Sequence, residues 1–209
     1  MPVPRVLVLD LGGVCCTYHP GRRLAGLGAA AGLSPDEVYA RVFGSGLAER
    51  ANAGELTGAE VHRLVCAALV VDLPRPELRR IWASAFVPDD AVLAVLAEVR
   101  PRLRTALLTN NGPLLRDGLD TELPALAYRF DALLFSCDLG AVKPHPAAFA
   151  AATAVLDVEP TDVLFVDDDA DNVDAATAAG WRAVLHTTPG ALAHRLGDRP
   201  TTTSGAVPR

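Results

Sequence analysis

The fold is decided by the stretch VLVLDLGG, residues 6–13, near the start of the chain. Its first four residues form a continuous apolar run, which is typical of a strand buried on both faces of a parallel sheet. The run stops at Asp10, and a glycine-rich turn begins at Gly12 and Gly13. We therefore predict a buried strand over residues 5–10, with the carboxyl group of Asp10 at its carboxyl end.

The second half of the chain repeats this pattern of short apolar strands, each followed by a helical segment. Such alternation indicates parallel pairing with helices on both faces of one sheet. The predicted fold class is therefore α/β, a doubly wound parallel Rossmann-like sheet formed by residues 1–16 and 101–198. Its further strands are predicted over four segments: 104–108, 132–135, 163–166 and 182–186.

The segment between the first two strands, residues 17–100, is too long for a simple crossover and has a helical pattern throughout. Two capping boxes, SPDE at 34–37 and TGAE at 57–60, mark helix starts. Further helices are predicted over 75–86 and 88–100, and no strand is predicted in this segment. We expect it to form an inserted cap of four helices.

Composition limits the classes of protein and partner. The 209 residues suit one α/β domain with an insert, and 50% apolar residues exclude disorder for most of the chain. The tail, residues 199–209, is rich in Thr, Ser, Gly and Pro and is expected to be disordered. The net charge of −6 argues against a nucleic-acid partner. No apolar run approaches the ~20 residues that cross a bilayer.

The apolar run near the N-terminus has neither the preceding basic stretch nor the following cleavage site of a signal peptide, so we expect a cytoplasmic protein without a membrane partner. We expect it to be a monomer or a homodimer. The four cysteines form no CxxC pair and no cluster with histidine. We expect them to be reduced thiols that fill small apolar spaces.

Polar residues follow three of the predicted strands, at the sheet edge where ligands of parallel sheets bind. Crowded carboxylates at this edge need a cation to remain ionised together, and oxygen ligands suit Mg²⁺. An aspartate placed there can attack phosphorus, and hydroxyl, amide and ammonium groups can bind the phosphoryl oxygens. The pattern predicts a magnesium-dependent phosphoryl-transfer site with these members: Asp10, Thr109, Asn110, Lys143, Asp167 and Asp168. For Asp169, which follows them, a solvated acid at the start of a helix is favoured.

These motifs resemble those of the haloacid dehalogenase-like hydrolase superfamily, in order and in spacing. They read DLGGV at 10–14, LLTN at 107–110, KP at 143–144 and DDDADN at 167–172. The helical insert is similar to the cap of the superfamily's phosphoglycolate-phosphatase-like branch. The forms of the first and last motifs are similar to those of sugar-phosphatase-like members and of the phosphatase domain of soluble epoxide hydrolase.

The resemblance implies a phosphatase or phosphotransferase that acts on a small phosphorylated metabolite. In that reading Asp10 is the nucleophile and carries a phosphoaspartate intermediate. Thr109, Asn110 and Lys143 bind the phosphate, and Lys143 also belongs to the catalytic group.

The resemblance also implies a Mg²⁺ site. Asp10, the backbone carbonyl of Gly12, and Asp168 are the expected ligands. Asp167 is either a weaker ligand or a neighbour that orients the site. Asn172 either holds the metal-binding loop through its amide or simply caps a helix.

One position departs from the family pattern. The family carries a second aspartate two residues after the nucleophile, where it protonates the leaving oxygen and later activates water, whereas this chain has Gly12 at that position. His19 is a candidate substitute, although a linker role for it is favoured. The Arg22-Arg23 pair could contact an anionic substrate, although a solvated helix face is favoured.

Two other functions stay open, and Gly12 supports the first of them. The first is a non-catalytic binding or regulatory protein that keeps the fold. The second is a metal-independent dehalogenase, which the acidic pair Asp167-Asp168 speaks against because a halide site has no use for a metal-binding carboxylate cluster.

Overall fold

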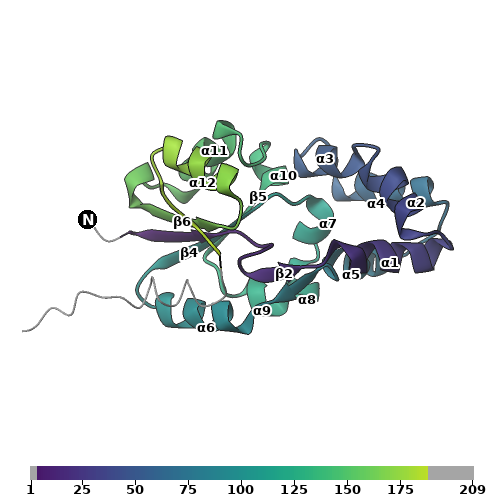
Figure 1. Cartoon of the computed structure of the whole chain (residues 1–209), viewed down its shortest axis with the longest axis horizontal. Helices are drawn as coiled ribbons and strands as arrows, with labels where there is room; N and C mark the ends of the chain where they lie inside the picture. The colour runs from purple at the N-terminus through teal and green to yellow at the C-terminus, as the bar shows by residue number, and fades with distance from the viewer. Residues whose placement is uncertain (1–3, 188–209) are drawn as a thin grey trace, which may run out of the picture.

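A five-stranded parallel sheet forms the centre of the molecule in the computed structural model, which describes residues 4–187 (Figure 1). The strand order is β5-β4-β1-β6-β7. The chain therefore winds outward from β1 in both directions, which confirms the doubly wound α/β class. The strands are β1 (Val6–Leu9), β4 (Arg104–Thr109), β5 (Ala132–Phe135), β6 (Val163–Asp167) and β7 (Arg182–Leu185).

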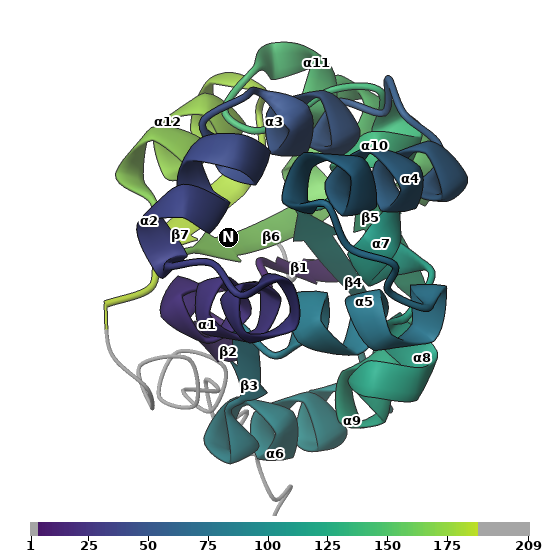
Figure 2. The same cartoon turned by 90° about the vertical axis from the view of Figure 1, so that its right-hand side faces the viewer.

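Helices cover both faces of the sheet, which explains why β1 is apolar without alternation. The first, α6 (Asp90–Val99), lies on one face with α9 (Pro124–Ala127). On the other face lie α11 (Pro146–Leu156) and α12 (Ala170–Ala178) (Figures 1 and 2). Successive side chains of β1 enter the two cores in turn: Leu7 and Leu9 belong to one buried cluster, Val6 and Val8 to the other. Short connecting helices are α7 (Pro113–Arg116), α8 (Leu119–Glu122), α10 (Ser136–Leu139) and the 3₁₀ turn η2 (Pro160–Asp162).

A second group of helices lies beyond the carboxyl ends of the strands, on the right of Figure 1. Both predicted capping boxes are present, because Ser34 and Glu37 exchange hydrogen bonds and Thr57 and Glu60 do the same. These pairs satisfy backbone N–H groups that the first turn of a helix leaves without partners. The group comprises α1 (Pro20–Ala31), α2 (Pro35–Val38), the π-helical η1 (Tyr39–Phe43), α3 (Leu47–Asn52), α4 (Gly58–Leu69) and α5 (Arg75–Ala83).

The prediction of an insert without strands was wrong. Antiparallel strands β2 (Cys16–Tyr18) and β3 (Phe86–Pro88) form a two-stranded ribbon where the chain leaves and re-enters the sheet domain. Each strand has three residues, too few for a readable period, and each depends on a partner far away in the sequence. Because β3 pairs with β2, α5 ends at Ala83 and not at the predicted residue 86.

The predicted boundary at residue 100 also differs from the structure. We expected the helix over 88–100 to belong to the insert, but α6 lies on one face of the sheet and away from the helices on the right of Figure 1. Its Leu93 and Leu96 are buried in a cluster that contains Leu7 and Leu9 of β1 as well as residues of the insert. The helices beyond the sheet therefore end with α5.

The four cysteines are free, as expected, with Cys15 and Cys16 buried and Cys66 and Cys137 partly buried. Within residues 4–187, no helix has both the length and the apolar character to cross a membrane. The predicted disordered tail, 199–209, lies outside the described residues.

Candidate active site

The strand register brings the two aspartates at the ends of β1 and β6 side by side. Leu9 of β1 lies opposite Val166 of β6, so the next residues, Asp10 and Asp167, fall at the same level of the sheet. The backbone N–H of Asp10 also donates to the carbonyl of Val166. The carboxyl ends of two neighbouring strands thus place two acidic groups at one point of the sheet edge.

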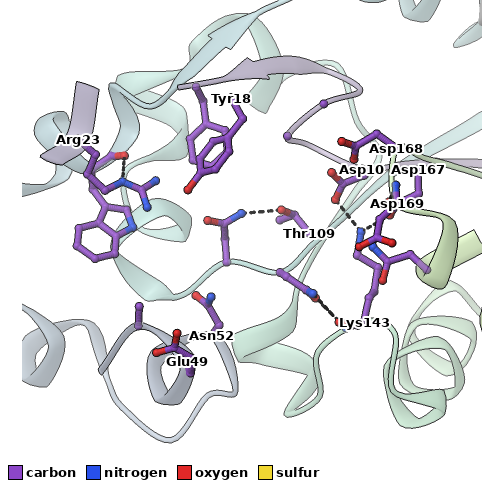
Figure 3. Close-up of a pocket in the computed structure, with 18 of the residues that line it drawn as sticks. Asp10, Tyr18, Arg23, Glu49, Asn52, Thr109, Lys143, Asp167, Asp168 and Asp169 are labelled. Carbon is purple, nitrogen blue, oxygen red and sulfur yellow. Dashed lines mark hydrogen bonds and ion pairs between the residues drawn. The ribbon is translucent and has the colours of Figure 1, made fainter. Parts of the chain in front are cut away.

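Lys143 bridges these two aspartates from the loop between α10 and α11 (Figure 3). Its Nζ lies 2.6 Å from Oδ1 of Asp10 and 2.6 Å from Oδ2 of Asp167, and it donates to the carbonyl of Leu108 at 3.0 Å. An ammonium group has three donors, so all three are used within the protein. The contact with phosphate predicted for Lys143 would therefore replace one of these partners.

Asp167 is engaged on both carboxylate oxygens. While Oδ2 faces Lys143, Oδ1 accepts hydrogen bonds from the backbone N–H of Asp169 at 2.9 Å and from Nδ2 of Asn172 at 3.0 Å. Asp169, and not Asn172, caps α12 through its side chain. These contacts favour the orienting role for Asp167 and the loop-holding role for Asn172.

Asp168 reaches the same point from the exposed side of the loop. One ligand atom each of Asp10, Asp167 and Asp168 can be chosen so that all lie within 4.8 Å of one another. Gly13 makes this approach possible: its φ is +81°, and a Cβ there would overlap the carboxylate of Asp168. A side chain at position 13 would therefore push Asp168 away from the cluster.

The pKa values of the clustered side chains show that their negative charges would be stabilised by a bound cation. Burial raises the pKa of Asp10 to about 6; attraction by Lys143 opposes this shift, and repulsion by Asp167 adds to it. Burial and the negative charge of Asp167 also raise the pKa of Asp168. Burial disfavours the charge of Lys143, but the carboxylates of Asp10 and Asp167 outweigh it, so the pKa of Lys143 is raised.

The donor set fits a hard divalent cation, because it consists of carboxylate oxygens whose ionised forms the protein alone stabilises poorly. Lys143 contacts Oδ1 of Asp10, so the bridge does not use Oδ2. The side-chain Oδ1 of Asn172 is buried and has no hydrogen-bond partner within the described part of the chain.

The end of β4 supplies the predicted phosphate donors, together with contacts that the sequence did not predict. Thr109 is buried, and its hydroxyl accepts a hydrogen bond from Asn111 at 2.7 Å, which leaves the hydroxyl hydrogen for another acceptor. The amide of Asn110 donates to the carbonyl of Lys143 at 2.7 Å and accepts from its N–H at 2.8 Å. The side chain of Asn110 thus holds the backbone of Lys143 in place.

Gly12 lies beside these groups and lines the same cavity. A Cβ at this position would meet the side chains of Tyr18 at 3.6 Å and Phe86 at 3.6 Å, which is ordinary contact. Gly12 is not among the glycines with positive φ. The backbone therefore requires no glycine at this position, and a Cβ would fit there without a clash.

A cavity of about 620 Å³ extends from these residues to the helical insert. This volume is in the range of small-molecule sites. The predicted solvated face for Arg22-Arg23 holds for Arg22, which is exposed, but not for Arg23, which is buried and lines the cavity. His19 is exposed and links β2 to α1, as favoured from sequence. The insert and ribbon contribute Tyr18, Arg23, Phe43, Ala48, Glu49, Asn52, Trp82 and Phe86 to the lining.

The chain belongs to the haloacid dehalogenase-like hydrolase family, whose sequence pattern matches residues 4–180. It is therefore a hydrolase, and the resemblance inferred from its motifs is confirmed.

Similar proteins include phosphatases. The chain is 40% identical over 115 residues to Phosphatase MT3486 of Mycobacterium tuberculosis, covering 53% of this chain and 52% of that protein. It is 30% identical over 115 residues to Bifunctional epoxide hydrolase 2 of Mus musculus, covering 53% of this chain and 21% of that protein. The chain thus spans about half or less of these curated relatives.

The fold matches solved structures over nearly the whole chain. A HAD family enzyme from Bacteroides thetaiotaomicron superposes with a TM-score of 0.77 at 19% identity, covering 93% of this chain and 98% of that one. The same enzyme has been solved in complex with magnesium and inorganic phosphate, and that structure superposes with a TM-score of 0.73 at 20% identity over 88% of this chain and 94% of that one. At this identity the likeness shows the fold alone.

Proposed function

We propose that the chain is a magnesium-dependent phosphatase that acts on a small phosphorylated metabolite through a phosphoaspartate at Asp10. One observation carries the proposal: the carboxylate of Asp10 lies 2.6 Å from Lys143 at the wall of a cavity, with Asp167 and Asp168 in the same cluster. The phosphatases among its relatives, and the magnesium and phosphate bound by a protein of the same fold, support this reading.

The metal site in this proposal consists of Asp10, the backbone carbonyl of Gly12, and Asp168, with Asp167 orienting the group. When bound, Mg²⁺ would neutralise phosphoryl oxygens and the charge that develops during transfer. Thr109 and Asn110 would donate hydrogen bonds to the phosphoryl oxygens, and Lys143 would supply positive charge while keeping the Asp10 carboxylate in place.

The reaction proceeds in two displacements at phosphorus. In the first, an oxygen of Asp10 attacks phosphorus, the bond to the ester oxygen breaks, and the alcohol leaves with that electron pair and takes a proton from solvent. In the second, water attacks phosphorus and gives up a proton to solvent. The bond between phosphorus and Asp10 breaks, inorganic phosphate leaves, and the carboxylate is regenerated.

Gly12 affects both displacements because it has no acidic side chain. Positioned general acids and bases are typically worth about 10²–10⁴-fold in rate. We therefore expect the first displacement to be efficient only with phosphates whose leaving group needs little protonation, such as anomeric, aryl or acyl phosphates.

We also propose that α1 to α5 act as the cap of the enzyme. This segment contributes six residues to the cavity lining, so the choice of substrate would depend on it: Arg23, Phe43, Ala48, Glu49, Asn52 and Trp82.

Phosphate release from a broad panel of phosphate esters, with and without Mg²⁺, tests the proposed function. The Asp10→Asn variant should abolish release, whereas Asp171→Asn should not, because Asp171 is an exposed residue of α12 outside the carboxylate cluster. If no ester is hydrolysed in Mg²⁺ at any pH near neutrality, the proposal fails.

Gly12 favours one other function, a binding protein that keeps the site without turnover. Binding of Mg²⁺ and beryllofluoride without hydrolysis of any ester would support it. Metal-free dehalogenation is disfavoured by the three-carboxylate cluster, and halide release that persists in a chelator would revive it.

A further inference from the structure

Arg23 is a buried cation that the phosphoryl-transfer site does not use. Only 5% of the residue is exposed. It lies on α1 one turn before Leu27, which is also buried, so this face of the helix points inward. Burying an unpaired charge is costly, and Arg remains protonated in proteins. A buried arginine therefore needs an explanation.

Aromatic rings surround the guanidinium group of Arg23. Its Cζ lies 4.6 Å from the ring centre of Trp82, 5.5 Å from that of Phe86 and 5.9 Å from that of Tyr18. Its Nε donates to the backbone carbonyl of Trp82 at 2.9 Å. These contacts hold the group rigidly but leave its positive charge without a carboxylate.

The outer end of the guanidinium group lacks a hydrogen-bond partner at Nη2 among the described residues. Nη2 of Arg23 is buried and has no hydrogen-bond partner, and no carboxylate among residues 4–187 forms an ion pair with it. The group faces Tyr18 and the interior of the pocket (Figure 3). Burial lowers the pKa of Arg23, and Tyr18 partly opposes this shift.

Tyr18 connects this position to the reacting group. The ring of Tyr18 lies between Arg23 and position 12, where a Cβ would be 3.6 Å from Cβ of Tyr18. Arg23, Tyr18, Gly12 and Asp10 line one continuous cavity. A molecule with its phosphoryl group at Asp10 could therefore extend along Tyr18 to the guanidinium group.

We propose that Arg23 binds a carboxylate at the far end of the substrate, so that the enzyme selects phosphate esters of carboxylic acids. This inference rests on the proposed function, because it assumes that the phosphoryl group lies at Asp10. One positive charge matches one carboxylate, and the acidic Glu49, which lines the same cavity from α3, disfavours a second phosphate dianion. The aromatic surroundings suit the uncharged chain between the two anionic ends.

Binding of non-hydrolysable ligands tests the role of Arg23 independently of turnover. The probes are ω-phosphonocarboxylates of increasing chain length, the alkylphosphonates that replace the carboxylate by a methyl group, and the corresponding diphosphonates. Titration calorimetry in saturating Mg²⁺ should show that the best phosphonocarboxylate binds about 10- to 100-fold more tightly than its alkyl counterpart, the range expected for hydrogen bonds between charged groups.

The variants isolate the guanidinium group. Arg23→Met should remove the preference for the carboxylate, Arg23→Lys should retain part of it, and Arg22→Met, which alters the exposed neighbour on the same helix, should leave it unchanged. Thermal unfolding checks that each variant folds. The comparison of ligands on the unmodified protein stands even if Arg23→Met does not fold.

The outcomes separate this inference from the proposed function. Equal binding of carboxylate and alkyl ligands to the unmodified protein would overturn it, as would tighter binding of diphosphonates or a preference that survives in Arg23→Met. If phosphate esters are hydrolysed without this preference, only the role of Arg23 fails. If the preference is found but no ester is hydrolysed, only the phosphatase activity fails.

Discussion

The variant Gly12→Asp adds a carboxyl group at a position where a Cβ can be accommodated and which faces the cavity. A Cβ there would contact Tyr18 at 3.6 Å and 3.7 Å and Phe86 at 3.6 Å, and the φ of Gly12 is not in the left-handed range. The new side chain would extend from the cavity wall, two residues after Asp10. We expect the variant to fold and to place an acid beside the leaving oxygen.

The expected gain follows from what a general acid contributes. Proton transfer in the transition state is typically worth about 10²–10⁴-fold, or about 2.7–5.5 kcal/mol of barrier. For an alkyl phosphate, whose leaving alkoxide is strongly basic, Gly12→Asp should raise kcat/KM by at least about 10²-fold. For p-nitrophenyl phosphate, whose leaving group needs no proton, the gain should stay below about tenfold.

The assay is steady-state phosphate release from both esters in Mg²⁺, compared among the unmodified protein, Gly12→Asp and Gly12→Asn. The asparagine variant matches the size of the new side chain but offers no acid, so it should show no selective gain on the alkyl ester. The reasoning is refuted if Gly12→Asp folds and binds Mg²⁺ but hydrolyses the alkyl phosphate no faster than Gly12→Asn.

Three further predictions concern the charges of the cluster. Lys143→Met leaves two buried carboxylates without their cation, so the free energy of unfolding in EDTA should fall by about 3–5 kcal/mol; an unchanged urea midpoint would contradict this. The pKa of Asp10 is raised to about 6 by burial, so the folded state binds a proton more strongly than the unfolded chain. Without metal, the contribution of Asp10 to stability is therefore greatest below its ordinary pKa near 3.8, and about 3 kcal/mol should be lost as the pH rises through about 6. Chemical denaturation of Asp10→Asn across this pH range should lack that slope, and an identical slope would count against Asp10 as its source. Gly13→Ala should weaken Mg²⁺ binding by about tenfold or more in calorimetry, because its Cβ would displace Asp168; unchanged affinity would mean that Asp168 is not a ligand.

Much of the site could be predicted from the sequence because ligands of parallel sheets bind at the carboxyl ends of the strands, and each strand end can be recognised from a short apolar run. Asp10 and Asp167 each follow an apolar run, and the register of β1 and β6 brings them together as expected from any parallel sheet. The capping boxes at Ser34 and Thr57 are similarly local, since each uses partners within one helical turn. The formation of these capping boxes therefore does not depend on contacts with the rest of the chain.

The parts that could not be predicted depend on contacts between distant segments. The burial of Arg23 requires the carbonyl of Trp82, 59 residues away, and nothing in the Arg22-Arg23 pair says which arginine faces inward. The hydrogen bonds between the side chain of Asn110 and the backbone of Lys143 likewise join residues that are 33 positions apart in the sequence. Apolar periodicity cannot report such pairings.

The ribbon of β2 and β3 has a consequence for how this enzyme could be re-engineered. Cys16 pairs with Pro88 and Tyr18 with Phe86, so the chain leaves and re-enters the sheet domain at neighbouring points. A segment whose two ends already meet can be exchanged as a module, because its replacement need not alter the spacing of the strands beneath. We expect the helices from Pro20 to Ala83 to be transplantable between relatives if the ribbon is kept. Under the proposed function, the chemistry at Asp10 would then stay with the host sheet, and the choice of substrate would be transferred with the transplanted helices.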